Sequence, residues 1–400
     1  MYSSSTVLVA MLLVSACAFD GSNSSTANDP GNTVDASDGD PSNTDAMSAS
    51  QDAQPGCQNY ATHFDACAID PENDDELNLN DPGQYTYNTD TGTLLDPSNN
   101  EVTHKNMLIS ASQGSIRVVV TNTFSLARDA VLRAEGSVPL AIGAFSTLAI
   151  GGVIDVSRGG AGARDLCGTS NGSNGGDEDG GGGGGGGGAF RGQGGDGGLG
   201  NGDGGNQGTV GPGGMAANIP TSPLGGCPGG AGGRGEDQGG NRGMGGGAIT
   251  LAAGTQITIS GGIQAGGAGG QGGREGGAGF ADAGGGGGGS GGYIFLEAPA
   301  LKISGIVAAN GGSGGEGSGN GSQGNNGNSG VFGNVPAIGG TGGSPTGSDG
   351  ANGSAADTLA GGTVMVSEDG GAGGGGGGAG FILFTSADRD ISGAISPASM

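Results

Sequence analysis

The chain has 400 residues, of which 104 are Gly and 15 are Pro, and only 32% are hydrophobic. This composition argues against a single large packed core and predicts a thin core spread along the chain, because little apolar surface is available for burial. The formal net charge of −26 excludes nucleic acid as a partner, because the protein surface would repel a polyanion.

Residues 1–16 are predicted to be a signal peptide. The apolar stretch VLVAMLLVSA at 7–16 is too short to span a bilayer, and it ends directly before Cys17. The sequence LVSAC at 13–17 resembles the lipobox of bacterial lipoproteins, in which the chain is cut before the Cys and its thiol receives a diacylglycerol. We therefore expect a lipid on Cys17 to anchor the protein in the outer membrane, on the cell surface. Cleavage after Ala18 is the alternative and would give a secreted protein, and the leader lacks the usual positive charge.

Residues 17–55 are predicted to be a lipid-anchored, disordered acidic linker, because they contain too little apolar area to fold. An acidic lead-in bounded by cysteines follows at 56–100, and a β-strand lead-in or cap at 101–138. The stretches NTDTG at 88–92 and IDPENDDE at 69–76 are rich in oxygen ligands. Neither has the spacing of a calcium loop with its distal Glu, so both are expected to be solvated acidic turns.

Five cysteines are present, and four remain once Cys17 is assigned to the lipid. An even number of cysteines in an exported protein predicts two disulfides. Three pairings are possible, and we expect Cys57 with Cys67 and Cys167 with Cys227. The second bond would close a large loop around the longest glycine run, which constrains the unfolded chain more. Because no C-x-x-C and no Cys/His cluster occurs, no metal site and no cofactor are predicted.

Four segments of the region 139–400 share a pattern of alternating apolar residues, which predicts strands with one buried face. Their sequences are TLAIGGVIDVS, QITISGGIQAG, ALKISGIVAAN and DRDISGAISPA. The residues that align are Leu148, Ile257, Leu301 and Arg389; Ile150, Ile259, Ile303 and Ile391; Gly152, Gly261, Gly305 and Gly393; and Ile154, Ile263, Val307 and Ile395.

A short alternating run precedes each of these segments, so each unit is expected to be a strand, a corner and a second strand. Stacked units bury the face that one unit cannot, which predicts an all-β parallel solenoid over 139–400. The shared Gly suits a tight bend, and Arg389 would cap the last unit. The spacing between units is irregular and no strand pair is found near residue 347, so one unit has degenerated or the regularity is partly chance. Four strands of an ordinary β-sandwich are the alternative.

Long glycine-rich stretches separate the units, and part of them repeats as G-G-x. A chain in the polyproline II conformation has three residues per turn, so every x lies on one side and two sides are bare. Bare sides let neighbouring backbones approach and exchange hydrogen bonds. The all-glycine runs 180–188, 284–289 and 373–378 are therefore expected at the centre of a polyglycine II bundle. Disordered loops are the alternative.

Several stretches after about Tyr85 combine strand patterns with polyglycine: YTYNTDTGTL, VLRAEGSVPLAI, TLAIGGVIDVS and GGGGGGSGGYIFLEAPALKISGIVAANGGSGG. In these stretches the chain resembles large glycine-rich surface lipoproteins of Gram-negative bacteria, for which no activity is established. The resemblance implies a cell-surface location and a β-solenoid, and it implies no functional residues.

These features predict a non-catalytic surface protein with a structural or adhesive role. Surface glycans or matrix are the partners considered, and the sequence does not indicate an oligomeric state. One alternative is a glycan-binding module that uses strand faces bearing Thr and Ser; another is a polysaccharide-degrading β-helix enzyme. No convergent set of acids, bases or metal ligands is found on the strands, and His63 and His104 both precede the repeats.

Overall fold

The computed structural model describes residues 57–70, 72, 74–201, 206–235, 238–274, 282–365 and 369–400. The chain divides into two units, Met1–Asp52 and Ala53–Met400, and every described residue belongs to the second unit. The expected signal peptide, the lipidation site Cys17 and the linker 17–55 lie outside the described residues.

The described part of the chain is nearly all-β, with mostly parallel strands in three sheets. Within it, helical structure is limited to α1 (Ala66–Ile69) and one 3-10 turn (Gly168–Ser170), and no described helix is long and apolar enough to cross a membrane. The prediction of an all-β protein is therefore confirmed.

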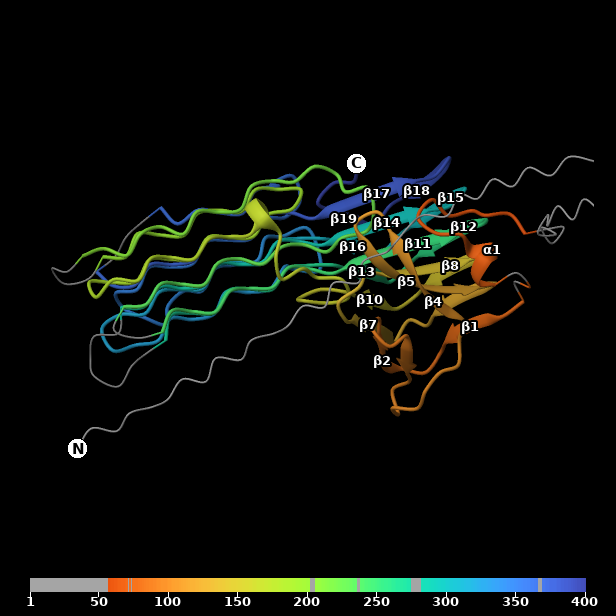
Figure 1. The fold of residues 1–400 in the computed structure, drawn as a ribbon, viewed down its shortest axis with the longest axis horizontal. Coiled ribbons are helices and arrows are strands. Elements are labelled where there is room, and N and C mark those ends of the chain that lie inside the picture. Colours follow the sequence, from red (N-terminus) through yellow and green to blue (C-terminus); the bar gives the residue numbers. More distant parts are fainter. Residues whose placement is uncertain are drawn as a thin grey trace, which may run out of the picture. The chain divides into compact units, whose positions relative to one another are not determined.

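Each successive repeat adds one strand to each of the three sheets (Figure 1). Sheet A has the order β1 (Glu76–Leu79), β6 (Thr123–Leu126), β9 (Thr147–Ile150), β12 (Gln256–Ile259), β15 (Ala300–Ile303), β18 (Asp388–Ile391). Sheet B has the order β19 (Ala394–Ser396), β16 (Ile306–Ala308), β13 (Gly262–Gln264), β10 (Val153–Asp155), β7 (Ala130–Glu135), β2 (Gly83–Asn88), β3 (Thr93–Leu95). Sheet C has the order β17 (Phe381–Thr385), β14 (Tyr293–Glu297), β11 (Ala248–Ala253), β8 (Leu140–Ala144), β5 (Gly114–Thr121), β4 (Asn106–Ala111). The pairs β2–β3 and β4–β5 are antiparallel.

The residues that align in the sequence are register partners in the sheets. Ile257 pairs with Leu148 on one side and with Leu301 on the other, and Leu301 pairs with Arg389. Ile259 lies in the same way between Ile150 and Ile303. The sequence pattern therefore predicted the pairing register residue by residue.

The tight bend expected at the shared glycine is present, and it is a corner between two sheets. Each segment read as a single strand is two strands in two sheets, because the chain turns between sheet A and sheet B at the shared glycine. A Cβ on Gly261 would collide with the carbonyl oxygen of Gly152, and a Cβ on Gly305 with that of Gly261. Only glycine lets the successive corners stack this closely.

The irregular spacing of the repeats comes from insertions at one corner of the stack. Every glycine-rich excursion leaves after a strand of sheet B and returns to a strand of sheet C. The first excursion is 156–247, the second 265–292 and the third 309–380. The stretch near residue 347 belongs to the third excursion and forms no strand pair in the described residues. The strands β5, β6 and β7 form a further repeat ahead of residue 139.

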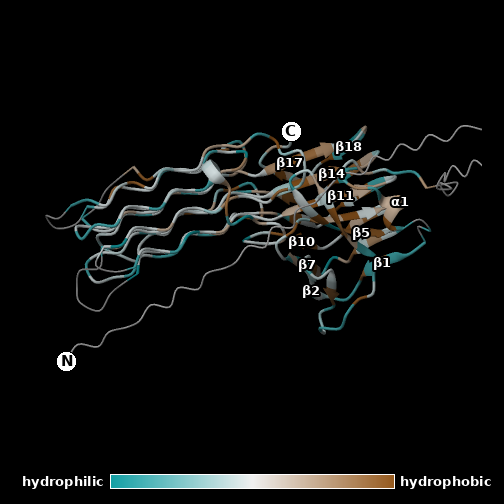
Figure 2. Cartoon of the chain, viewed as in Figure 1, coloured by the Kyte–Doolittle hydropathy of each residue, from teal (hydrophilic) through white to brown (hydrophobic). Residues whose placement is uncertain are grey.

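The interior of the three sheets is a ladder of Leu and Ile side chains, and Figure 2 shows the apolar residues gathered there. The segment that contains α1 covers part of the outer face of sheet C. Phe64 and Ala66 pack with Val118 and Ala141 in a second apolar cluster. The Tyr60 ring packs edge-on against a further aromatic ring, with centroids 5.3 Å apart. This cover is closed by the Cys57–Cys67 disulfide.

The last strand of sheet A is exposed along its whole length. Arg389 of this strand folds back, so that its Nη2 donates to the carbonyl oxygen of Phe384 at 2.9 Å and its Nε to that of Ser386 at 3.3 Å. A charged residue thus occupies the ladder position at the end of the stack, where an apolar one would meet water.

Candidate functional site

The nine-glycine run Gly180–Gly188 is surrounded by six neighbouring chain segments. Its N–H groups donate to three of them in turn, with Gly182 to Asp282, Gly183 to Gly176 and Gly184 to Gly198, and the cycle repeats at the next three glycines. Its carbonyl groups accept from three others, whose donors are Gly208, Gly211 and Gly214; Gly230 and Gly233; and Ala372, Gly375 and Gly378. The period of three is that of an extended chain with three residues per turn.

The other two glycine runs, Gly284–Gly289 and Gly373–Gly378, pair directly with the first run and with each other. The N–H of Gly185 donates to the carbonyl oxygen of Gly285 at 2.9 Å, and that of Gly288 donates to Gly375 at 2.9 Å. The three runs therefore form the centre of the bundle, and the chain segments that carry side chains surround them. Figure 1 shows these segments running side by side away from the sheets.

The three runs leave no space for a side chain. A Cβ on Gly184 would collide with the carbonyl oxygen of Gly373, one on Gly187 with that of Gly376, and one on Gly286 with that of Asn241. A Cβ on Gly333, a partly exposed residue of the third excursion, would have no heavy atom within 4 Å. Glycines of the surrounding segments are confined in the same way where they meet another backbone, since a Cβ on Gly213 would collide with the carbonyl oxygen of Gly194 and one on Gly350 with that of Gly314. The requirement for glycine is thus a property of the close backbone contacts within the bundle.

At the centre of the bundle the segments are joined by hydrogen bonds between backbones. In the surrounding segments, side chains also form hydrogen bonds with neighbouring backbones. The carboxylate of Glu316 has no exposed surface, and it accepts the N–H groups of Asn325 at 2.8 Å, Gly343 at 2.9 Å and Ser344 at 2.9 Å. Asn310 donates at 2.7 Å to the carbonyl oxygen of Gly333. Buried polar groups of this kind are tolerated because they are hydrogen-bonded.

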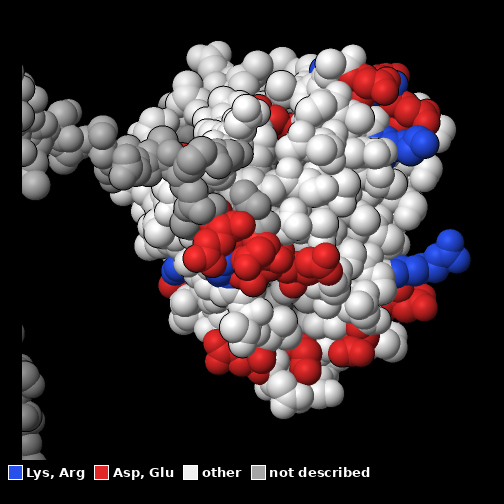
Figure 3. Space-filling view, turned by 90° about the vertical axis from the view of Figure 1, so that its right-hand side faces the viewer, with Lys and Arg blue, Asp and Glu red and all other residues white. Residues whose placement is uncertain are grey.

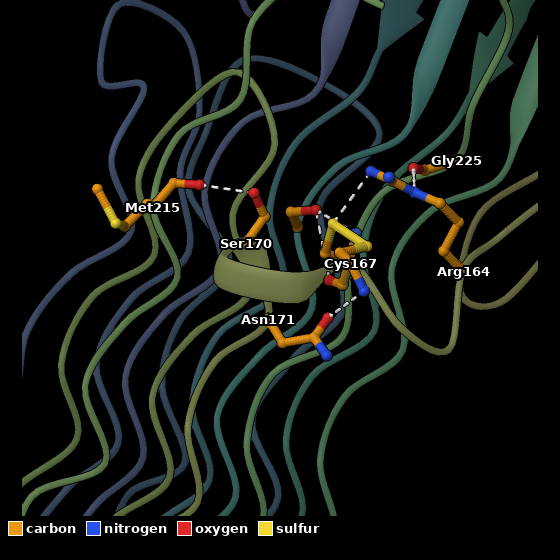
Figure 4. The surroundings of a disulfide bond; sticks show 8 residues. Arg164, Cys167, Ser170, Asn171, Met215 and Gly225 are labelled. Carbon is orange, nitrogen blue, oxygen red and sulfur yellow. Dashed lines mark hydrogen bonds between the residues drawn. A yellow bond between two sulfur atoms is a disulfide. The ribbon is translucent and has the colours of Figure 1, made fainter. Parts of the chain in front are cut away.

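The base of the bundle is closed by the Cys167–Cys227 disulfide (Figure 4). Both expected disulfides are thus present. Beside this bond the Arg164 side chain donates through Nε to the carbonyl oxygen of Gly225 at 2.7 Å, and its Nη2 lies 3.1 Å from Sγ of Cys227. The guanidinium also lies 5.0 Å from the centre of the Phe190 ring. Burial lowers the pKa of Arg164.

The acidic stretch 69–76 forms an ion-pair cluster around a lysine. Nζ of Lys105 lies 2.6 Å from Oδ1 of Asp70, 2.8 Å from Oδ2 of Asp75 and 3.6 Å from Oδ1 of Asp74. The hydrogen bonds to Asp70 and Asp75 raise the pKa of the Lys105 ammonium. In the described residues these carboxylates are the group close enough to hold a cation, and the lysine already lies among them.

The stretch 88–92 is a turn that the side chain of Asn88 holds in place. Oδ1 of Asn88 accepts the N–H groups of Asp90 at 2.9 Å and Thr91 at 3.2 Å. Gly92 has a φ of 77°, which a residue with a side chain rarely adopts. These contacts are those of an asparagine turn.

The two histidines lie in different parts of the structure. His63 packs edge-on against Phe295 with ring centres 4.7 Å apart, and burial lowers its pKa while the charge of Glu297 raises it. His104 packs against Tyr87 at 5.5 Å, and its Nδ1 lies 2.9 Å from the carbonyl oxygen of Val102. Within the described residues neither ring is hydrogen-bonded to a Ser or Cys side chain, so no nucleophile and base pair is formed there.

No described segment covers the outer face of sheet A, which lies on the side away from the bundle (Figure 1). Its middle strands carry the neutral, partly exposed side chains of Thr123, Ser125, Thr147, Gln256 and Thr258. Charged residues stand in its flanking strands, where Lys302 and Asp390 pair at 3.8 Å. Figure 3 shows an uncharged area with charged groups around it. With strands about 4.8 Å apart, the face is a flat array of short polar side chains.

No protein-family model, no curated protein and no solved structure matches this chain.

Proposed function

We propose that the protein is a non-catalytic surface lipoprotein of a Gram-negative outer envelope, with a structural or adhesive role, similar to the glycine-rich surface lipoproteins named above. The observation that supports this proposal is that the three glycine runs hydrogen-bond to one another. It allows the glycine-rich excursions to form a rigid body although they contain few apolar side chains of their own.

The strand-bearing part of this body would be a parallel β-solenoid. Successive repeats contribute to sheet C, then sheet A, then sheet B, and equivalent residues such as Ile150, Ile259 and Ile303 are register partners. A β-sandwich would be built from antiparallel sheets, whereas the repeats pair in parallel. The three inserted excursions would form a polyglycine II bundle on one corner of this solenoid.

The proposed location follows from the N-terminal sequence. A diacylglycerol on Cys17 would anchor the chain, and the linker 17–55 would hold the body on the order of 30–40 Å from the membrane if it behaves as a flexible coil. The two disulfides fit an oxidising compartment. A secreted protein, cleaved after Ala18, is the alternative.

The anchor and the body can be tested together in the native host. Cys17→Ser should move the protein to soluble fractions and abolish labelling with a fatty-acid analogue. Gly286→Val should disrupt the bundle and reduce surface attachment or cell aggregation. Gly333→Ala should leave the bundle, surface attachment and cell aggregation unchanged. A membrane fraction that is unaffected by Cys17→Ser would contradict the anchor. Normal attachment with a demonstrably disrupted bundle would contradict the adhesive and structural role.

A second candidate function is glycan binding by the uncovered face of sheet A. The observation that favours it is the neutral array of Thr123, Thr147 and Thr258, which no described segment covers. Saturable binding on a glycan array that is lost in Thr147→Lys would favour this function. Depolymerisation of any member of a polysaccharide panel by the purified protein would favour the enzyme instead.

A further inference from the structure

We propose that Cys167 is a thiol-exchange site: an external thiolate forms a mixed disulfide with Cys167, and Cys227 is released as a thiolate paired with Arg164. The ligand class is a low-molecular-weight thiol or the dithiol of an oxidoreductase. The inference stands independently of the adhesive role.

The two sulfur atoms of this disulfide differ in access. Cys227 is completely buried, whereas Cys167 is partly exposed. The neighbours of Cys167 are open to solvent, since the Leu166 side chain is 80% exposed and Gly168 is exposed as well. A nucleophile from solvent therefore reaches the sulfur of Cys167 and leaves that of Cys227 on the far side of the bond.

The two sulfur atoms also differ in electrostatic surroundings. The Arg164 guanidinium lies 3.1 Å from Sγ of Cys227 (Figure 4), and no carboxylate pairs with it among the described residues. Its known contacts are the carbonyl oxygen of Gly225 and the face of Phe190. A partly buried guanidinium without a counter-ion stabilises an adjacent thiolate and makes it a better leaving group.

The exchange balances as a substitution at sulfur. The electron pair of the incoming thiolate forms a new S–S bond to Cys167, and the pair of the old S–S bond leaves on Cys227. The negative charge therefore moves from the external thiol to Cys227, beside Arg164. In the reverse direction the Cys227 thiolate attacks the mixed disulfide on Cys167 and expels the external thiolate. The bond would form after export by the same route: the Cys167 thiolate attacks the disulfide of an external thiol and expels one thiolate, and Cys227 then attacks the mixed disulfide and expels the other.

The second disulfide provides a matched control in the same molecule. Cys57 and Cys67 are both partly exposed, and within the described residues neither sulfur contacts an Arg or Lys side chain. The N–H of Cys67 donates to the carboxylate of Asp65 at 3.0 Å, so the nearby charge is negative. Neither sulfur of this pair has a cation that would favour it as a leaving group.

The test treats the folded protein with reduced glutathione, quenches with acid, alkylates the free thiols and maps each cysteine by mass spectrometry. We expect glutathione on Cys167 and the alkyl group on Cys227. Arg164→Gln should slow opening of this disulfide on the order of tenfold, and Arg164→Lys should restore part of the rate. Opening of Cys57–Cys67 should be unchanged in both variants.

Two outcomes would overturn the proposal: glutathione found on Cys227, or an unchanged rate in Arg164→Gln relative to the Cys57–Cys67 control. If Arg164→Gln fails to fold, the pH dependence of the ultraviolet thiolate absorbance in Cys167→Ser reports the pKa of the remaining Cys227 thiol, and this measurement needs no reagent to reach the buried sulfur. A pKa below the ordinary value of about 8.5 supports the proposal, and an equal or higher pKa contradicts it.

Discussion

The N–H of Gly375 donates a hydrogen bond of 2.8 Å to the carbonyl oxygen of Gly185, and so joins the third glycine run directly to the first. These residues belong to excursions that leave the sheets at different repeats. Their pairing requires the stacked strands to place both excursions at the same corner, and it requires bare backbones at the point of contact. The contacts within the bundle therefore depend on the stacking of the strands in the sheets.

A single methyl group at the centre of this contact should destabilise the protein. A Cβ on Gly185 would collide with the carbonyl oxygens of Gly230 and Ala231. We expect Gly185→Ala to lower the free energy of unfolding by about 1–3 kcal/mol or more, because packed backbones must separate. Denaturant unfolding of the purified protein measures this change. Gly333→Ala, whose Cβ meets nothing, should stay within about 0.5 kcal/mol, and an equal loss in both variants would mean that the runs are not closely packed.

The apolar ladder of the sheets should carry a comparable share of the stability. Ile259 is completely buried between its register partners Ile150 and Ile303. Ile259→Ala should cost about 2–5 kcal/mol, because the stacked neighbours cannot collapse into the cavity. The neighbouring Thr258→Ala changes the outer face of the same strand and should cost less than about 0.5 kcal/mol. Similar denaturation midpoints for the two variants would contradict an interior ladder.

The register of the sheets was predictable because identical side chains recur at equivalent positions. Alternation identified the buried residues, and alignment of Leu148, Ile257, Leu301 and Arg389 predicted their pairing. The bend at the shared glycine was expected, but the division into two sheets at this bend was missed, because a turn between two sheets keeps the parity of the apolar pattern. The added repeat at Gly114–Glu135 was missed because its corner lacks the shared glycine.

The contacts of the candidate site were less predictable than the fold. The glycine runs indicated their own central position, since only a residue without Cβ fits between backbones. Arg164 stands three residues before Cys167, but sequence spacing does not reveal that its guanidinium meets Cys227. The ion-pair cluster around Lys105 was missed for the same reason, because it joins residues that are distant in the chain.

Acid should weaken the cover over sheet C through His63. Burial lowers the pKa of this ring in the folded protein, so the unfolded chain binds the proton more readily. The contribution to stability is therefore complete above the ordinary histidine pKa of about 6.5 and declines as the pH falls from there toward the lower folded pKa. Unfolding free energies at pH 7.5 and pH 5 should differ more in the wild type than in His63→Gln. An NMR titration that places the His63 pKa at or above 6.5 would contradict this.

Amide hydrogen exchange should show uniform protection across Gly284–Gly292 and protection of every third residue in the neighbouring segment 240–246. Every N–H from Gly284 to Gly292 donates to a backbone carbonyl in an adjacent segment, so all of these amides should exchange slowly except for those lost to fraying. In the segment beside it, Gly240, Gly243 and Gly246 donate to the carbonyl oxygens of Gly284, Gly287 and Ser290. The amides of Asn241, Arg242 and Met244 have no acceptor within the described residues and should exchange quickly, because these residues are exposed or partly exposed. Residue-resolved exchange of the folded protein distinguishes this pattern from disordered loops, in which all of these amides exchange quickly, and from an ordinary sheet edge, in which every second amide is protected.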